Sequence, residues 1–133
     1  MLTVPWETIN APLTFHQQSL TIQREIGDRQ GEANSLGNLG STYIFLGKYQ
    51  RGIDFLQQYL AIAREMGDRQ GETNSLNNLG VAYEDLREYQ RAIDFYQQSL
   101  AIAREIVSTK GETISLSNLG SVLDALGKTD LGD

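Results

Sequence analysis

The sequence repeats itself every forty residues, and this feature limits the fold more than any other. Residues 27–66 and residues 67–106 align without a gap, and 28 of 40 positions are identical. The same period continues outward, because residues 15–20 resemble residues 55–60 and residues 111–120 resemble the start of each repeat. A repeat of this length cannot bury its apolar side chains alone, so consecutive copies stack on one another. We therefore expect a stacked array of similar units.

The period also predicts how the chain is divided. Two complete repeats are flanked by one half repeat on each side, and short segments remain at the termini. The expected segments are an irregular N-terminal segment 1–10, a half repeat 11–26, full repeats 27–66 and 67–106, a half repeat 107–126 and a C-terminal tail 127–133.

Each repeat predicts two helices joined by a short turn. In the first helix Leu36, Leu39 and Tyr43 recur at the spacing of one helical face, and the second helix has a similar apolar stripe. Gly67 can end a helix in a left-handed conformation, and Asp68 can cap the helix that follows. No stretch alternates apolar and polar residues as a strand would. The expected helices cover residues near 11–26, 30–46, 49–66, 70–86, 89–106 and 110–126.

The residues of the first helix resemble the signature of the tetratricopeptide repeat. The motif Leu-x-x-Leu-Gly-x-x-Tyr occurs twice, and Ala92-x-x-x-Tyr96 resembles the second-helix signature. The first-helix motif consists of Leu36, Leu39, Gly40 and Tyr43 in its first copy and of Leu76, Leu79, Gly80 and Tyr83 in its second copy. The forty-residue period and the Gly-Asp-Arg link look like the longer variant of Pins/LGN-type scaffolds and kinesin light chains. The resemblance implies an all-α, right-handed superhelical α-solenoid of antiparallel helix pairs. Gly52 departs from the pattern, because alanine is usual there, and Leu123 stands where tyrosine is expected.

The resemblance also implies that the first helices line a concave groove that binds a peptide. Ligand-facing positions in such repeats are spaced i, i+4, i+7 and i+11. In this sequence they are Asn34, Asn38, Ser41 and Phe45, then Asn74, Asn78, Val81 and Asp85, then Ile114, Asn118, Ser121 and Ala125. We predict that all of these except Ile114 and Ala125 bind the peptide.

Three asparagines, Asn38, Asn78 and Asn118, occupy one equivalent position in successive repeats. A carboxamide has both donors and an acceptor, so it can pair with the backbone of an extended peptide of any sequence. The alternative is structural, since asparagine can also bond a neighbouring helix, and duplication alone copies residues. Both interpretations stay open at this stage.

The charge pattern limits the kind of partner. The net charge of -6 is unfavourable for a phosphate backbone, so no nucleic acid is expected. Relatives that clamp a terminal carboxylate place Lys or Arg on the stripe, and this chain does not. Glu84, Asp85 and Asp124 lie on or beside the stripe and favour a neutral or basic partner segment. The alternative is an acidic face that only contacts solvent.

Catalysis and cofactor binding are not expected. The chain has no cysteine and one histidine, His16, so neither a thiolate site nor a histidine metal site can be assembled. No nucleophile, base and orienting group occur together. No apolar run approaches the roughly 20 residues that span a bilayer, and the N-terminus lacks signal-peptide features. We expect a cytoplasmic protein with no membrane partner.

The two half repeats suggest an alternative function. Leu119, Val122, Leu123 and Leu126 lack a following helix that would cover them. The chain is an excerpt of a longer array, or residues 1–10 with Trp6 cover one end, or the terminal helices of two copies stack. The last contact would be heterologous and would build rings or chains. We therefore expect a protein-interaction scaffold that binds a partner peptide, with a self-assembly module as the alternative.

Overall fold

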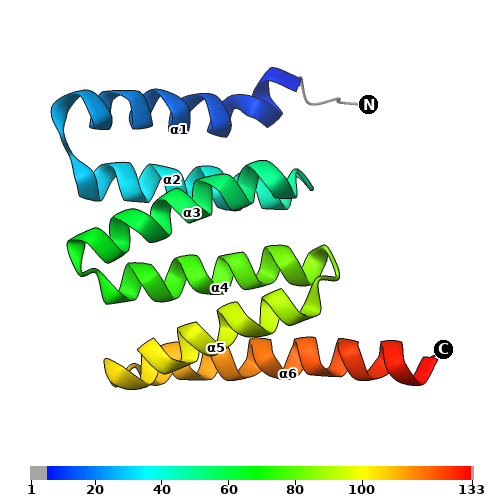
Figure 1. The fold of residues 1–133 in the computed structure, drawn as a ribbon. Coiled ribbons are helices and arrows are strands. Elements are labelled where there is room, and N and C mark those ends of the chain that lie inside the picture. The colour runs from blue at the N-terminus through cyan, green and yellow to red at the C-terminus, as the bar shows by residue number, and fades with distance from the viewer. Residues whose placement is uncertain (1–5, 133) are drawn as a thin grey trace. The chain divides into compact units, whose positions relative to one another are not determined.

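The computed structural model describes the backbone of residues 6–132 and the side chains of residues 10–128, and it contains six α-helices (Figure 1). Within these residues there is no strand, and none of the helices is long and apolar enough to cross a membrane. This confirms the predicted all-α fold of paired helices. The helices are α1 (Trp6–Ile26), α2 (Arg29–Phe45), α3 (Tyr49–Met66), α4 (Arg69–Asp85), α5 (Tyr89–Glu105) and α6 (Thr109–Gly132).

The four inner helices match the expected bounds to within one residue, but the terminal helices are longer than expected. Helix α1 begins at Trp6 rather than near residue 11, and Pro12 lies inside it. Helix α6 continues to Gly132 rather than ending near residue 126. An ion pair of 3.1 Å between Lys128 Nζ and Asp124 Oδ2, one helical turn apart, supports the extension of α6. Residues 1–5 and 133 of the two expected terminal segments lie outside the described residues.

The chain divides into two compact units, one ending at Ile62 and the other beginning at Ala63. In the first unit, α1 and α2 run antiparallel and pack with residues 55–62 of α3 (Figure 1). Apolar side chains from the three helices form one core, which is why none of these helices needs to be stable alone. The core contains Leu13, Leu20, Ala33, Leu36, Leu39, Tyr43 and Ile62, with Leu46, Phe55 and Tyr59 packed against it.

In the second unit, α4 contacts both α5 and α6, and α5 runs antiparallel to its two neighbours (Figure 1). The Tyr96 ring of α5 lies directly over Gly80 of α4, where any larger side chain would overlap the ring. The Tyr83 and Phe95 rings stack beside this point, with centroids 5.5 Å apart. Gly80 thus lets two helices of one repeat approach closely.

Gly52, which departs from the family pattern, has a local explanation in the first unit. A Cβ atom at Gly52 would lie 2.5 Å from the Ile44 Cδ1 atom of α2. The second repeat has Ala92 and Glu84 at the equivalent positions. Glycine at position 52 lacks the methyl group that Ala92 has in the second repeat, and it occurs together with the large Ile44 side chain. Helices α2 and α3 therefore remain in contact at this point.

The turns between helices follow the predicted capping. Asp28 and Asp68 accept hydrogen bonds of 2.9 Å from the backbone N–H groups of Gly31 and Gly71, which confirms the cap proposed at Asp68. Gly67 ends α3 with φ of 68°, but its equivalent at the end of α5 is Val107, with φ of 54°. A β-branched residue is strained in this left-handed region.

Candidate peptide-binding surface

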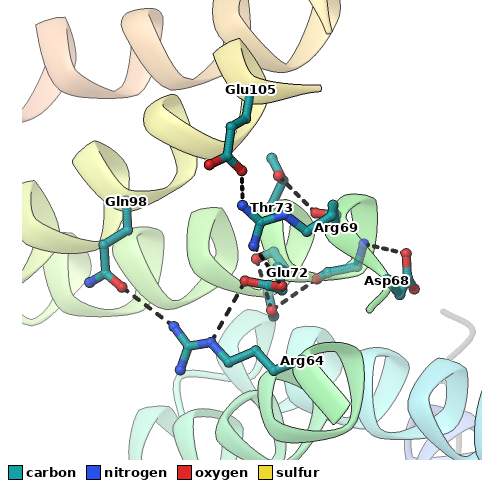
Figure 2. Close-up of polar contacts among 9 residues, drawn as sticks. Arg64, Asp68, Arg69, Glu72, Thr73, Gln98 and Glu105 are labelled. Atoms are coloured by element: carbon teal, nitrogen blue, oxygen red, sulfur yellow. Dashed lines mark hydrogen bonds and ion pairs between the residues drawn. The ribbon is translucent and has the colours of Figure 1, made fainter. Parts of the chain in front are cut away.

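Buried carboxylates hold the starts of α2 and α4, two of the three helices that carry the candidate site. Glu72, in the first turn of α4, pairs with Arg69 at 3.0 Å and with Arg64, from the end of α3, at 3.7 Å. Figure 2 shows that Arg64 also reaches Gln98 and that Arg69 also reaches Glu105, both on α5. Glu72 and its two arginines thus connect three consecutive helix segments.

The first unit repeats this arrangement around Glu32 of α2. Arg29 and Arg24 donate to its carboxylate at 2.9 and 3.1 Å, and Arg24 also donates to Gln58 at 3.0 Å. Burial alone would raise the pKa of Glu32, but hydrogen bonds from Arg24 and Arg29 and their charges outweigh it, so the pKa is lowered. Arg24, Arg64 and Arg104 occupy the same position in successive repeats, and each pairs with an acidic residue, which is Glu112 for Arg104.

All residues of the predicted stripe lie outside the buried core. Four of them are exposed in α2, and in the second unit most are exposed while three are half-buried. The four are Asn34, Asn38, Ser41 and Phe45; the exposed ones in the second unit are Asn74, Val81, Asp85, Ile114 and Ser121, and the half-buried ones are Asn78, Asn118 and Ala125. The spacing in the sequence therefore identified residues that lie at the surface of the first helix of each repeat.

The asparagines of this surface differ in what they bind. Asn34 and Asn74 each accept a hydrogen bond of 3.1 Å from the glutamine one turn earlier, Gln30 or Gln70. The side chains of Asn38, Asn78 and Asn118 make no hydrogen bond with any other residue that the structure describes. Their donors and acceptors are therefore available to a ligand.

Two polar contacts bring the stripes of α4 and α6 together in the second unit. Ser115 donates to the Asn77 side chain at 3.5 Å, and Ser121 donates to the Glu84 carboxylate at 3.0 Å. Asn78 and Asn118 lie between these contacts along their helices, so their amides come from neighbouring helices. Asn77 was not among the expected site residues, because the Asn-Asn pair in the sequence does not show which amide faces the next helix.

A groove of about 450 Å³ lies between the first turns of α4 and α6. Asn74 and Ile114 of the predicted stripe contribute to its wall, and the asparagines at 78 and 118 do not. Gln30, Gln70 and Lys110 occupy one position in successive repeats, one helical turn before the predicted stripe begins. This repeated long polar side chain is the sequence signal that could have located the groove. Its principal lining residues are Gln70, Asn74, Asn77, Ser108, Lys110 and Ile114.

The three acidic residues near the stripe have different roles. Glu84 accepts from Tyr96 Oη at 2.9 Å as well as from Ser121, and Asp124 pairs with Lys128. Burial, the hydrogen bond to Glu84 and nearby negative charge raise the pKa of Tyr96. Burial and the charge of Glu84 also raise the pKa of Asp85, which makes no ion pair with another described residue. Asp85 is therefore the acid best placed to meet a ligand.

No metal site accompanies this surface in the part of the chain that the structure describes. No group of three His, Cys, Asp or Glu residues there could hold a metal ion.

Comparison with known proteins agrees with the paired-helix structure. Human (Homo sapiens) G-protein-signaling modulator 1 is 49% identical over 37 residues, which are 28% of this chain and 6% of that protein. The proteins of the same name from Mus musculus and Rattus norvegicus are 35% identical over 43 residues, which are 32% of this chain and 6% of each protein. The chain therefore aligns with only a small part of these relatives.

The sequence model described as "Tetratricopeptide repeat" matches residues 13–65 and 71–131, which together make up most of the chain. These ranges contain the repeated Leu-x-x-Leu-Gly-x-x-Tyr motif and the helix pairs that it forms. Such repeats are protein-interaction modules, and the chain belongs to the tetratricopeptide repeat family.

Proposed function

We propose that the exposed faces of α2, in the first unit, and of α4 and α6, in the second unit, bind extended segments of a partner protein. The observation that carries this proposal is that Asn38, Asn78 and Asn118 occupy one repeated position and make no hydrogen bond with another described residue. Asparagines needed only for structure would be bonded to a neighbouring helix, as Asn77 is to Ser115. Unbonded amides at one position of successive repeats suit the repeated polar groups of a peptide backbone.

The chemistry of a carboxamide fits a peptide backbone. Each amide can donate to a peptide C=O group and accept from an N–H group, so binding needs no particular side chain at that point. The neighbouring positions then supply specificity. Phe45 and Val81 offer exposed apolar contacts, and Asp85 favours a neutral or basic segment. The groove beside Lys110 accepts a polar side chain of the same segment.

The wider setting of this activity is part of the same proposal. The chain acts as a non-catalytic scaffold in the cytoplasm, without a cofactor and without nucleic-acid or membrane partners. Its net charge of -6 supports the exclusion of nucleic acid. The name of the relatives refers to G-protein signalling, but the alignment covers 6% of their length, so we assign no signalling partner to this chain.

A peptide-display selection followed by calorimetry tests the proposal. A peptide selected on the wild-type chain is titrated into a variant that carries Asn38→Ala, Asn78→Ala and Asn118→Ala. Each lost hydrogen bond is worth about 0.5–1.5 kcal/mol, so the affinity should fall tenfold or more. The matched control carries Gln57→Ala and Gln97→Ala, at exposed positions of the second helices.

The two results lead to opposite conclusions. If the triple asparagine variant keeps its helical circular dichroism and loses affinity while the glutamine control binds normally, the amides bind the peptide. Equal affinity of all three proteins for the selected peptide would refute the proposal.

A further inference from the structure

Helix α6 presents an apolar face that the equivalent helix α4 buries. Leu123 is 55% exposed, whereas Tyr83 at the same position of α4 is 8% exposed. Leu116 is also exposed, although its counterpart Leu76 is fully buried. In α4, Tyr83 stacks on Phe95 of α5, the second helix of the same repeat, and α4 and α5 pack against each other. The surface of α6 therefore exposes apolar side chains at positions that form a helix interface in α4.

Helix α1 presents the complementary face. Ile22 is 55% exposed, whereas Ile102 at the same position of α5 is 8% exposed, and Phe15 is also largely exposed. Residues 15–26 and residues 95–106 share Phe, Gln-Gln-Ser-Leu, Ile and Arg-Glu-Ile at equivalent positions. Helix α1 thus carries most of the side chains with which α5 covers α4.

Individual contacts between α4 and α5 have counterparts on α6 and α1. Tyr96 lies over Gly80, and His16 is the equivalent of Tyr96. The equivalent of Gly80 is Gly120, where an added Cβ would meet nothing within 4 Å. A space for the ring of His16 is therefore open on α6.

The polar contacts have counterparts as well. Tyr96 Oη donates to Glu84 at 2.9 Å, and the equivalent residues are His16 and Asp124, again a donor and a carboxylate. Ser99 donates to the Thr73 carbonyl at 3.4 Å, and the equivalent residues are Ser19 and Thr113. Both kinds of contact in the α4–α5 interface can therefore form again.

We propose that α6 of one copy of this chain packs against α1 of a second copy and reproduces the α4–α5 interface between two molecules. The occupant is a second copy because α1 has the sequence that covers the same face within the chain. The contact joins two different surfaces, so it continues from copy to copy into chains or rings and does not stop at a twofold dimer. It uses residues outside the proposed peptide-binding stripe.

Sedimentation velocity over a wide concentration range tests this proposal. The wild-type chain should form larger species as its concentration rises. Leu123→Glu on α6 and Phe15→Glu on α1 should each weaken self-association at least tenfold, because a carboxylate would be buried at the junction. Gln97→Glu adds the same charge at an exposed position of α5 and should associate as the wild type does.

A mixture of the two disrupted variants gives the sharper result. The Phe15→Glu protein keeps its α6 face and the Leu123→Glu protein keeps its α1 face, so an equimolar mixture should form 1:1 dimers and nothing larger. Circular dichroism verifies that both variants are folded. A wild-type chain that stays monomeric at every concentration, or two folded variants that do not combine, would overturn the proposal.

Discussion

At the scale of single residues, the repeats reuse one polar arrangement to hold helix starts. Glu32 and Glu72 are buried carboxylates, and each is paired with two arginines whose side chains reach solvent. Burying a carboxylate is costly unless it is paired and hydrogen-bonded. Because the arginines come from the preceding helix end and from the same helix, this pairing sets how one helix follows another.

Replacing Glu32 with Gln should lower the free energy of unfolding by about 1–2 kcal/mol at neutral pH. Hydrogen bonds to a charged group are worth roughly 1.5–3 kcal/mol, and solvent around the two partly exposed arginines reduces this value. The pKa of Glu32 is lowered in the folded state, so its contribution is complete above the ordinary value of about 4.3. It is lost as the pH falls through the lower, folded-state value. Urea unfolding should therefore show a difference between the wild type and Glu32→Gln that shrinks in acid. A difference that grows as the pH falls would contradict this assignment.

Val107 offers a second residue-scale prediction. It has φ of 54°, a conformation that costs an L-residue about 1–2 kcal/mol, and its equivalent Gly67 has φ of 68° without that cost. Val107→Gly should raise the free energy of unfolding by about 1 kcal/mol after the extra backbone entropy of glycine is subtracted. The matched change Gly67→Val should lower it. Thermal unfolding measures both, and changes of the same sign in the two variants would refute the explanation.

At the scale of elements, two equivalent glycines lie in different surroundings. A Cβ atom at Gly80 would overlap the Tyr96 ring, whereas one at Gly120 would meet nothing within 4 Å. Gly80→Ala should therefore destabilise the chain by about 1–3 kcal/mol through overpacking. Gly120→Ala should stabilise α6 by about 0.5–1 kcal/mol, because alanine is the better helix former.

Chemical denaturation at low protein concentration measures both effects in the monomer. Gly120→Ala should also weaken the proposed α6–α1 association, because the added methyl group would occupy the space into which the His16 ring of the second copy is proposed to fit. A Gly120→Ala chain that is less stable than the wild type as a monomer would contradict the open position of this glycine.

The sequence predicted the inner helices better than the terminal ones, and the reason lies in the repeat. Gly67 and Asp68 stand at a boundary that the period marks several times, and repeated turn residues identify helix ends reliably. No repeated residue marks the start of α1 or the end of α6, and Gly127 alone is too weak a breaker to stop a helix. We predicted the start of α1 and the end of α6 only from the point where the repeated pattern stops. Such a point locates a helix end less precisely than a repeated turn residue does.

The candidate site was predictable as a face but not as a set of contacts. Spacing along a helix shows which residues are exposed, so the stripe from Asn34 to Ser121 lies outside the core. Spacing does not show which polar side chains pair across helices. Asn77 and Glu84 are engaged by Ser115 and Ser121 respectively, and such contacts follow from the register between α4 and α6. The groove near Lys110 depends on the same register.

At the scale of the whole molecule, the two proposed surfaces are separate. The peptide-binding stripe uses Asn38, Asn78 and Asn118, and the proposed junction between copies uses Phe15, His16 and Leu123. Substitutions on one surface should therefore leave the other unchanged, provided that the helices remain folded. A chain with both activities presents several peptide sites on one assembly, which raises its apparent affinity for any ligand that contains more than one binding segment.

This coupling gives a prediction that depends on both proposals. A synthetic peptide with two tandem copies of the selected segment should bind the assembled wild-type chain about tenfold or more tightly than the single segment does, because the second binding event is intramolecular. The gain should largely disappear with Leu123→Glu, which keeps every residue of the stripe but not the junction. Calorimetry with single and tandem peptides on both proteins gives the two ratios. The single peptide should bind both proteins equally, and a tandem gain of the same size in both would show that the assembly adds nothing to peptide binding.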